Sequence, residues 1–279
     1  MEKTNYPFSQ SPIDVVIPST PKDLDTIDLC IQGLRENVEN IGRIVVLSEV
    51  RLTDKAEWFD ERKFPFSRFD AAYEIFKDVE EANDYLTWRD RLFFNQILKL
   101  YAPLVIPNLS PNVLLIDSDT IFLNPVQFID SSGAGLYNAP GGHPSAMHFE
   151  HMERLLPGLK QIQPGLSGIV FHMLFQRPVL EDLFSRIEKH HGVPTWKAIC
   201  HTVDKSLVKG QCAIADYEIY FHFAFSRTDQ VKIRQLKWLN IVDNLEILPE
   251  LKRRGYHHVS CHDWARSKRE LYEIAKKAR

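Results

Sequence analysis

Two aspartates separated by one residue, Asp117 and Asp119, are the strongest chemical signal in the sequence. They follow four apolar residues, 113–116, which read as a buried strand whose end would hold both carboxylates in one place. Mg²⁺ and Mn²⁺ prefer oxygen ligands and often share them with substrate phosphates. The pattern predicts a divalent cation that neutralises a diphosphate here. The alternative, a turn that merely ends a strand, is disfavoured by the residues on both sides of the pair.

A second pair of carboxylates, Asp216 and Glu218, stands among aromatic residues. Either could act as a general base on an acceptor hydroxyl or position a donor sugar. The alternative is an exposed helix start, where acidic side chains interact favourably with the helix dipole. Trp196 and His172 are candidates for the lining of an acceptor site, because aromatic faces pack against sugars; the alternative for Trp196 is a place in the core.

The elements that must position these residues begin with a strand at 13–17, a helix at 23–37 and a strand at 43–48. This order predicts a βαβ unit with parallel strands, whose carboxyl ends usually bind the ligand. Residues 50–86 should form short helices and one further sheet edge. A helix at 87–101 should be stopped by Pro103.

The second half of the chain gives weaker signals. Strands are expected within 165–175, centred on 169–171, and at 239–248, and an amphipathic helix at 178–191. The segment 131–144 carries four glycines and two prolines, a composition typical of an irregular loop that could serve as a lid.

Composition excludes several function classes. The formal net charge of −3 over 279 residues provides no basic field for nucleic acid. Four cysteines without C-x-x-C spacing favour reduced thiols in a cytoplasmic protein. Neither a signal core nor a transmembrane segment is expected. The basic tail, 268–279, is expected to be a solvated helix, with weak contact to a membrane surface as the alternative.

The segment 113–123 resembles the strand-DxD-strand segment of GT-A glycosyltransferases, in particular the glycogenin and lipopolysaccharide-galactosyltransferase-like group and its uncharacterised bacterial relatives. Residues 17–20 resemble the first-strand loop that contacts the nucleoside in those enzymes. Gln96 and Lys99 lie on the helix that often supplies diphosphate or sugar contacts. Residues 166–171 resemble the small-residue strand that follows, although Leu or Ser replaces the usual Asn.

The resemblance implies a fold, a domain organisation and a reaction. The fold would be α/β, a Rossmann-like GT-A domain with a mixed, mostly parallel sheet flanked by helices. A single catalytic domain, 1–279, would divide into a nucleotide-sugar-binding half, 13–125, and an elaborated acceptor-binding half, 126–279. The protein would move a sugar from a nucleotide sugar, expected to be a UDP sugar, to a hydroxyl of a carbohydrate, lipid-linked or protein acceptor, with Mn²⁺ or Mg²⁺.

Site residues are implied on the same basis. Donor contacts would come from Pro18, Ser19, Thr20, Gln96, Lys99, Asp117, Ser118 and Asp119. Catalysis would involve Asp216 and Glu218, and the metal would be held by Asp117, Asp119 and His262.

The C-terminal histidines follow from the same comparison. In the resembling enzymes a histidine near the C-terminus completes the metal sphere, a role open here to His262 or His257. Strand alternation would point only one of His257 and His258 inward. A zinc site is the alternative, but it lacks a partner cluster elsewhere in the sequence.

Two other functions compete with glycosyl transfer. Phosphatases of the haloacid-dehalogenase type also use Asp-x-Asp after a buried strand, with the first Asp as nucleophile. They normally carry it on the first strand and place Thr or Val where Ile121 stands here. The other competitor is a non-catalytic carbohydrate-binding relative, against which the intact Asp117 and Asp119 argue.

Overall fold

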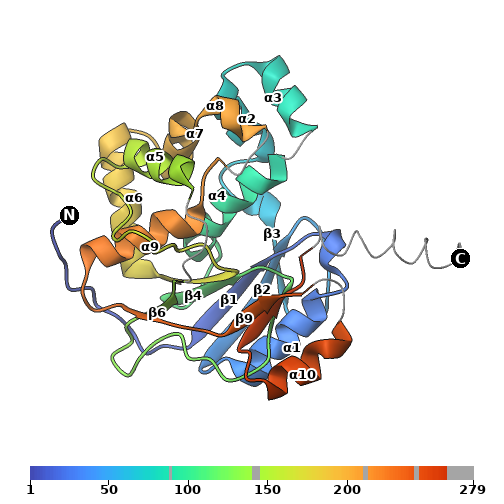
Figure 1. Cartoon of the computed structure of the whole chain (residues 1–279). Coiled ribbons are helices and arrows are strands. Elements are labelled where there is room, and N and C mark those ends of the chain that lie inside the picture. Colours follow the sequence, from blue (N-terminus) through green and yellow to red (C-terminus); the bar gives the residue numbers. More distant parts are fainter. Residues whose placement is uncertain (88–89, 140–144, 210–212, 242–244, 263–279) are drawn as a thin grey trace, which may run out of the picture.

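The structure is a computed structural model that describes residues 1–87, 90–139, 145–209, 213–241 and 245–262 (Figure 1). The basic tail and Pro140 to Pro144 of the glycine-rich segment lie outside these ranges. Within them, no helix is both long and apolar enough to span a bilayer.

A five-stranded sheet forms the centre of the fold. Its spatial order is β3 (Glu57–Asp60), β2 (Ile41–Ser48), β1 (Ile13–Pro18), β4 (Asn112–Ile116) and β7 (His172–Gln176). The first four strands are parallel, and β7 is antiparallel to β4. The predicted mixed, mostly parallel sheet and its initial βαβ unit are therefore confirmed. Every residue of β4 is buried, as its continuous apolar sequence requires.

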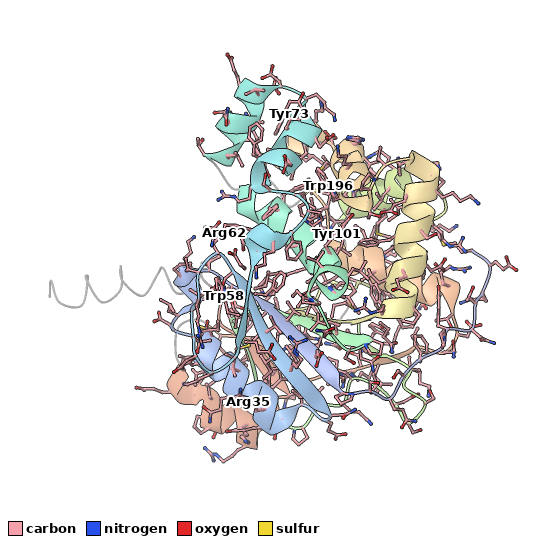
Figure 2. The ribbon with its side chains drawn as sticks, turned by 180° about the vertical axis from the view of Figure 1, so that it is seen from behind. Arg35, Trp58, Arg62, Tyr73, Tyr101 and Trp196 are labelled. Carbon is pink, nitrogen blue, oxygen red and sulfur yellow. The ribbon has the colours of Figure 1, made fainter. Side chains whose placement is uncertain are left out.

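Helices cover the sheet and extend beyond it (Figure 1). One side carries α1 (Ile27–Asn37) and α10 (Leu248–Arg253), which lie together in Figures 1 and 2. The others are α2 (Arg68–Phe76), α3 (Val79–Leu86), α4 (Asp90–Val105), α5 (Ala146–Leu155), α6 (Arg177–His191), α7 (Thr195–Thr202), α8 (Lys205–Val208) and α9 (Asp216–Arg227). Short 3₁₀ turns occur at Pro21–Asp23, Glu61–Lys63 and Leu245–Ile247.

A small second sheet places residues 258–260 beside β5, which follows β4 in the chain. Its order is β5 (Thr120–Phe122), β10 (His258–Ser260) and β9 (Trp238–Asn240), with β10 antiparallel to β5. The hydroxyls of Thr120 and Ser260 lie 3.0 Å apart in a buried hydrogen bond that fixes this register. Helix α1 packs close beneath, since a Cβ at Gly33 would lie 2.7 Å from the Phe122 carbonyl oxygen.

The prediction that Pro103 stops the fourth helix is wrong. Helix α4 continues through it to Val105. Proline inside a helix removes one hydrogen bond and costs about 3 kcal/mol. Ala102 and Ile106 on either side are buried, and the Ile106 N–H still reaches the Ala102 carbonyl at 3.1 Å. The free energy gained by burying this turn outweighs the cost of the hydrogen bond that proline cannot make.

Three other segments also differ from their predictions. The glycine-rich segment contains a strand, β6 (Leu136–Asn138), parallel to β8 (Lys232–Arg234), because Tyr137 is buried against α9. The strand centred on residues 169–171 begins only at His172, where pairing with β4 starts. Of the predicted strand at 239–248, residues 239–240 belong to β9, residues 242–244 lie outside the described ranges, and Leu245 already begins a 3₁₀ turn that leads into α10.

Candidate active site

The turn between β4 and β5 holds the two aspartates. The Asp117 N–H donates to the Phe171 carbonyl at 2.9 Å, and the Asp117 carbonyl accepts the Thr120 N–H at 3.0 Å. Ser118 is buried between the two aspartates. Both ends of the turn are therefore fixed by the backbone, one by the segment before β7 and one by the turn itself.

Asp119 and His262 meet at this turn. The Cys261 N–H donates to the Asp119 carbonyl at 3.0 Å, which extends the pairing of β10 with β5 by one residue. The next residue is His262, and its Nδ1 lies 3.2 Å from Asp119 Oδ2. The ring of Phe171 packs edge-on against His262, with centroids 4.7 Å apart.

The donor set of Asp119 and His262 fits a divalent cation. Two neighbouring ligands of an octahedral Mg²⁺ or Mn²⁺, each about 2.1 Å from the ion, lie about 3.0 Å apart. The observed 3.2 Å between Nδ1 and Oδ2 is close to that separation. The other carboxylate oxygen, Asp119 Oδ1, is buried and has no hydrogen-bond partner in the described residues. Such an oxygen is costly to leave unpaired, and a cation would satisfy it.

Asp117, the third predicted metal ligand, faces a different partner. Lys99 of α4 donates to Asp117 Oδ1 at 2.6 Å. Burial opposes the charge on Lys99, but Asp117 and other nearby oxygens raise the pKa of the ammonium well above its usual value. No group of three His, Cys, Asp or Glu side chains in the described part of the chain is arranged to hold a metal. The predicted trio is thus only partly assembled.

Asp216 lies at the first turn of α9 with its side chain enclosed. Its N–H donates to Gln96 Oε1 of α4 at 3.0 Å, which caps the helix. The residue is 2% exposed, and its Oδ2 has no partner in the described residues. Burial raises the pKa of Asp216 to about 7; Lys99 lowers it and Asp117 adds to the rise. Asp216, Lys99 and Asp117 therefore form one charge cluster next to the turn.

Both carboxylate oxygens of Glu218, the second predicted catalytic residue, have partners. Ser167 Oγ and the Gly168 N–H donate to its two oxygens, each at 2.7 Å. His222 Nε2 lies 2.9 Å from Oε2. This arrangement favours a structural role, and no bond links Glu218 directly to the Asp117–Asp119 turn.

The predicted nucleoside loop follows β1. The Ser19 N–H donates to the Leu47 carbonyl at 2.9 Å and continues the β1–β2 pairing past Pro18. The backbone N–H and the hydroxyl of Thr20 both donate to Asp23 Oδ2, at 3.0 and 3.1 Å. The loop is pre-shaped and lies at the same sheet edge as the aspartates.

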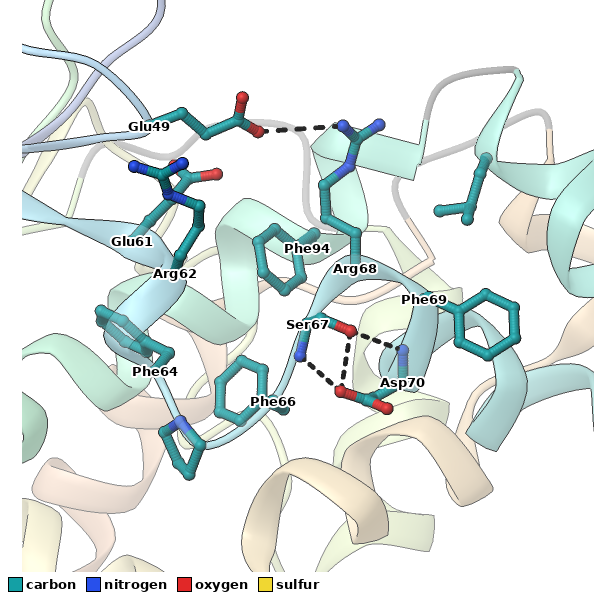
Figure 3. A pocket seen from close by; sticks show the side chains of 12 residues that line it. Glu49, Glu61, Arg62, Phe64, Phe66, Ser67, Arg68, Phe69, Asp70 and Phe94 are labelled. Carbon is teal, nitrogen blue, oxygen red and sulfur yellow. Dashed lines mark hydrogen bonds and ion pairs between the residues drawn. The ribbon is translucent and has the colours of Figure 1, made fainter.

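A cavity of about 740 Å³ opens at the carboxyl end of β2 (Figure 3). Phe64, Phe66 and Phe94 gather in its wall, while an Arg68–Glu49 contact of 4.0 Å lies at its rim. Since β2 is two strands from β4, this end lies about 10 Å from the aspartate turn. No sequence pattern predicted the cavity, because its lining residues come from separate parts of the chain: Glu49, residues 61–70, Leu86 and Phe94.

The aromatic candidates are placed in the interior. Trp196 lies near Tyr101 in Figure 2. It is 8% exposed, and its backbone N–H donates to the Tyr101 hydroxyl at 2.8 Å, which confirms the core alternative. His172 packs against Phe122 and Phe128, and burial lowers its pKa well below the usual value. It is an interior residue and not part of an open acceptor surface, which corrects the prediction.

The two remaining histidines follow the expected alternation. His258 is fully buried, whereas His257 is half-buried and its Nδ1 accepts the Lys237 N–H at 3.0 Å. Neither bonds to the aspartate turn in the described residues, and His262 is the histidine that does. Phe171, which accepts the Asp117 N–H and packs against His262, was not singled out as a site residue; only its place in the segment 166–171 pointed to it.

No protein-family model matches the chain, and no curated protein sequence matches it. Among solved structures, the chain is similar to WbbM, a bifunctional glycosyltransferase in its apo state. The sequence identity is 14% and the TM-score is 0.46, over 92% of this chain and 47% of that one. The chain spans about half the length of WbbM. This similarity is too low to transfer a function, which has to be argued from the site.

Proposed function

We propose that this protein is a glycosyltransferase that moves a sugar from a nucleotide-diphosphate donor to a hydroxyl acceptor with the help of Mn²⁺ or Mg²⁺. The observation that carries the proposal is the pair Asp119–His262, with the unpartnered Asp119 Oδ1 beside it, at the carboxyl edge of a mostly parallel sheet. Ligands of open α/β sheets bind at that edge.

Asp119 and His262 would hold the cation, and the diphosphate and water would complete its sphere. A divalent ion in such a site neutralises the charge that develops on the leaving nucleotide diphosphate. One or two protein ligands plus phosphate oxygens is the usual arrangement for Mg²⁺. Because an imidazole takes part, Mn²⁺ is the better match of the two.

Lys99 provides a second positive charge. Its ammonium lies 2.6 Å from Asp117 Oδ1, and the Lys99 side chain is only 10% exposed to solvent. A diphosphate that reaches the turn would meet Lys99 and Asp117 as a hydrogen-bonded pair. We propose that Lys99 stabilises the departing nucleoside diphosphate, and that Asp117 keeps the Lys99 ammonium in place.

The cavity beside β2 would take the nucleoside. Its aromatic wall suits the flat face of a nucleoside base, and its charged rim suits the polar edges of that base. Residues 18–20 lie at the end of β1, between the cavity and the turn in sheet order, where they would contact the ribose or the base. Uridine is the proposed nucleoside, on the resemblance of residues 113–123 to UDP-sugar enzymes. The acceptor would be a carbohydrate, lipid-linked or protein hydroxyl.

Asp216 is the proposed acid–base or sugar-positioning residue. With a pKa near 7, its carboxylate can accept a proton from an acceptor hydroxyl at neutral pH. Its enclosure beside Lys99 and Asp117 equally suits a contact with donor-sugar hydroxyls. Glu218 lacks a free oxygen for either task, and its role is taken up in the next subsection.

The test is donor hydrolysis. Purified protein is incubated with a panel of nucleotide sugars, with Mn²⁺ and with EDTA, and released nucleoside diphosphate is measured. Mn²⁺-dependent release from one donor supports the proposal, and none from any donor contradicts it. Phosphate release from a simple phosphomonoester would instead indicate the phosphatase. That reading is already disfavoured, since the motif follows β4 and not the first strand. Sugar binding without turnover would indicate the non-catalytic relative.

A further inference from the structure

The carboxylate of Glu218 is the most completely enclosed charge near the aspartate turn. The side chain is 0% exposed. Ile162 N–H donates to His222 Nδ1 at 3.3 Å, and His222 Nε2 lies 2.9 Å from Glu218 Oε2. Burial alone raises the pKa of Glu218, but His222, Ser167 and the Gly168 N–H together lower it below its usual value. Three polar groups, Ser167 Oγ, the Gly168 N–H and His222 Nε2, therefore surround this carboxylate.

The polar contact is reinforced by a steric one. A Cβ at Gly168 would lie 2.6 Å from the Tyr217 carbonyl oxygen and 2.6 Å from Phe221 Cβ. Only glycine allows the backbone at 168 to lie this close to α9. The segment 167–168 is thus joined to the first two turns of α9 by hydrogen bonds and by direct backbone contact.

Three residues further along, the same segment supports the turn that carries Asp119 and the ring of His262. The Phe171 carbonyl accepts the Asp117 N–H at 2.9 Å. The Phe171 ring packs against His262 on one side and Trp238 on another, with centroids 4.7 and 5.2 Å apart. A shift of the segment would move the backbone of Asp117 and the ring of His262 together.

Helix α9 reaches Asp117 by a second route. The Lys99 ammonium lies over the Tyr217 ring, 4.7 Å from its centroid, and donates to Asp117 at 2.6 Å. Gln96, one turn earlier on α4, accepts the Asp216 N–H. The first turn of α9 therefore fixes the Asp117 side chain through α4, and Glu218 fixes the Asp117 backbone through Phe171.

We propose that Glu218 is a positioning residue: by joining segment 167–171 to α9, its buried carboxylate holds the Asp117–Asp119 turn and the ring of His262 in the arrangement that binds the cation. The inference rests on the proposed function for the identity of the bound ion. It replaces the catalytic role that the sequence suggests for this glutamate, because the carboxylate acts through Phe171 and touches no reacting group.

The test uses Glu218→Gln and Mn²⁺ alone as the probe. Glutamine keeps the shape but removes the negative charge that faces the Gly168 N–H and His222, so the charge-assisted contacts become weaker. We expect the Kd for Mn²⁺, measured by electron paramagnetic resonance of free Mn²⁺, to rise about 10- to 100-fold, the usual effect of losing a support of a metal ligand. Hydrogen exchange at residues 167–171 and at the Asp117 amide should become faster.

Glu188→Gln is the matched control. Glu188 Oε1 accepts the Thr195 N–H at 3.1 Å and the Thr195 hydroxyl at 3.3 Å, which joins α6 to α7 away from the turn. The same substitution there should lower thermal stability and leave the Mn²⁺ Kd unchanged. Ser167→Ala removes one of the donors to Glu218 and gives a milder variant, with a smaller rise in Kd, should the glutamine variant not fold.

The outcomes separate this inference from the proposed function. If Glu218→Gln and Ser167→Ala bind Mn²⁺ as the wild type does, Glu218 has a purely structural role and the inference is overturned. If the wild-type protein itself does not bind Mn²⁺, the proposed metal site fails. Exchange at Asp117 then decides: faster exchange than in Glu188→Gln supports the positioning role, and equal exchange overturns it.

Discussion

His262 Nδ1 lies 3.2 Å from Asp119 Oδ2, although 143 residues separate them in the chain. The antiparallel pairing of β10 with β5 creates this contact, since Ser260 pairs with Thr120 and the next residues continue the ladder. The strand pairing therefore brings a nitrogen ligand to a strand-end carboxylate, and the position of His262 depends on backbone hydrogen bonds more than on its own side chain.

The first prediction concerns this histidine. His262→Ala should raise the midpoint of Mn²⁺ activation of donor hydrolysis by about 10-fold or more, because a direct ligand is lost. His257→Ala removes a half-buried ring that accepts the Lys237 N–H, and should leave the midpoint unchanged. His258→Ala should lower thermal stability, since the ring is fully buried, with a smaller effect on the midpoint. An unchanged midpoint in His262→Ala would exclude this ring from the metal sphere.

The second prediction concerns Asp119. Asp119→Ala should reduce Mn²⁺-dependent turnover at least about 100-fold, a loss comparable to removal of other key electrostatic groups. The fold should persist, because the Asp119 backbone carbonyl still accepts the Cys261 N–H. Asp229→Ala, which removes a carboxylate paired with Lys3 on the surface, is the control for turnover. A folded Asp119→Ala protein with near-normal turnover would refute the metal site.

The third prediction concerns the ion pair beside the metal site. Lys99→Met removes a cation that would repel the metal, and it frees Asp117 Oδ1 to join Asp119 and His262 as a ligand. The free protein should bind Mn²⁺ more tightly, with a larger rise in melting temperature on Mn²⁺ addition than in the wild type, while donor turnover falls. Without metal the variant should be less stable, since Asp117 loses its partner.

Lys197→Met provides the comparison for that variant. It removes an ammonium that lies 2.9 Å from the buried Glu74, between α7 and α2 and away from the turn, and it should leave the Mn²⁺-induced rise in melting temperature as it is in the wild type. Equal Mn²⁺ responses in Lys99→Met and the wild type would mean that Lys99 and the cation do not share Asp117.

The local parts of the site could be predicted from the sequence. The apolar run 113–116 and the alternation of strand and helix before it specify a buried parallel strand, and hence where Asp117 and Asp119 lie. The alternation between His257 and His258 was equally readable. These features depend on residues close together in the chain, where hydrophobic periodicity is informative.

The bonding partners could not be predicted in the same way. Asp117 accepts a hydrogen bond from Lys99 and does not lie beside another metal-ligating side chain in the way that Asp119 lies beside His262. Glu218 bonds to Ser167 and Gly168, about fifty residues earlier in the chain. Both choices are made by tertiary packing of α4 and α9 and by the close contact at Gly168. The sequence alone does not distinguish a catalytic base from a positioning carboxylate, because burial and neighbouring groups decide which role a carboxylate has.

The last prediction concerns Asp216 and pH. Its pKa is about 7 in the folded protein, against about 3.9 for an unfolded aspartate. Between these values the folded state binds one more proton than the unfolded state, so stability falls as pH rises from about 4 to 7. Three pKa units correspond to at most about 4 kcal/mol of lost stability at pH 8. Asp216→Asn removes the ionisation and with it this loss.

In EDTA, Asp216→Asn should therefore match the wild type in urea unfolding near pH 4 and exceed it in stability at pH 8. If Asp216 acts as a base, wild-type turnover should rise as pH increases through about 7, because only the ionised carboxylate accepts a proton. Asp182→Asn is the control, since hydrogen bonds from Tyr6, Arg227 and Arg186 lower the pKa of Asp182. That variant should be less stable than the wild type at pH 8. A stability difference between Asp216→Asn and the wild type that does not change with pH would show that the folded protein leaves the ionisation of Asp216 unperturbed.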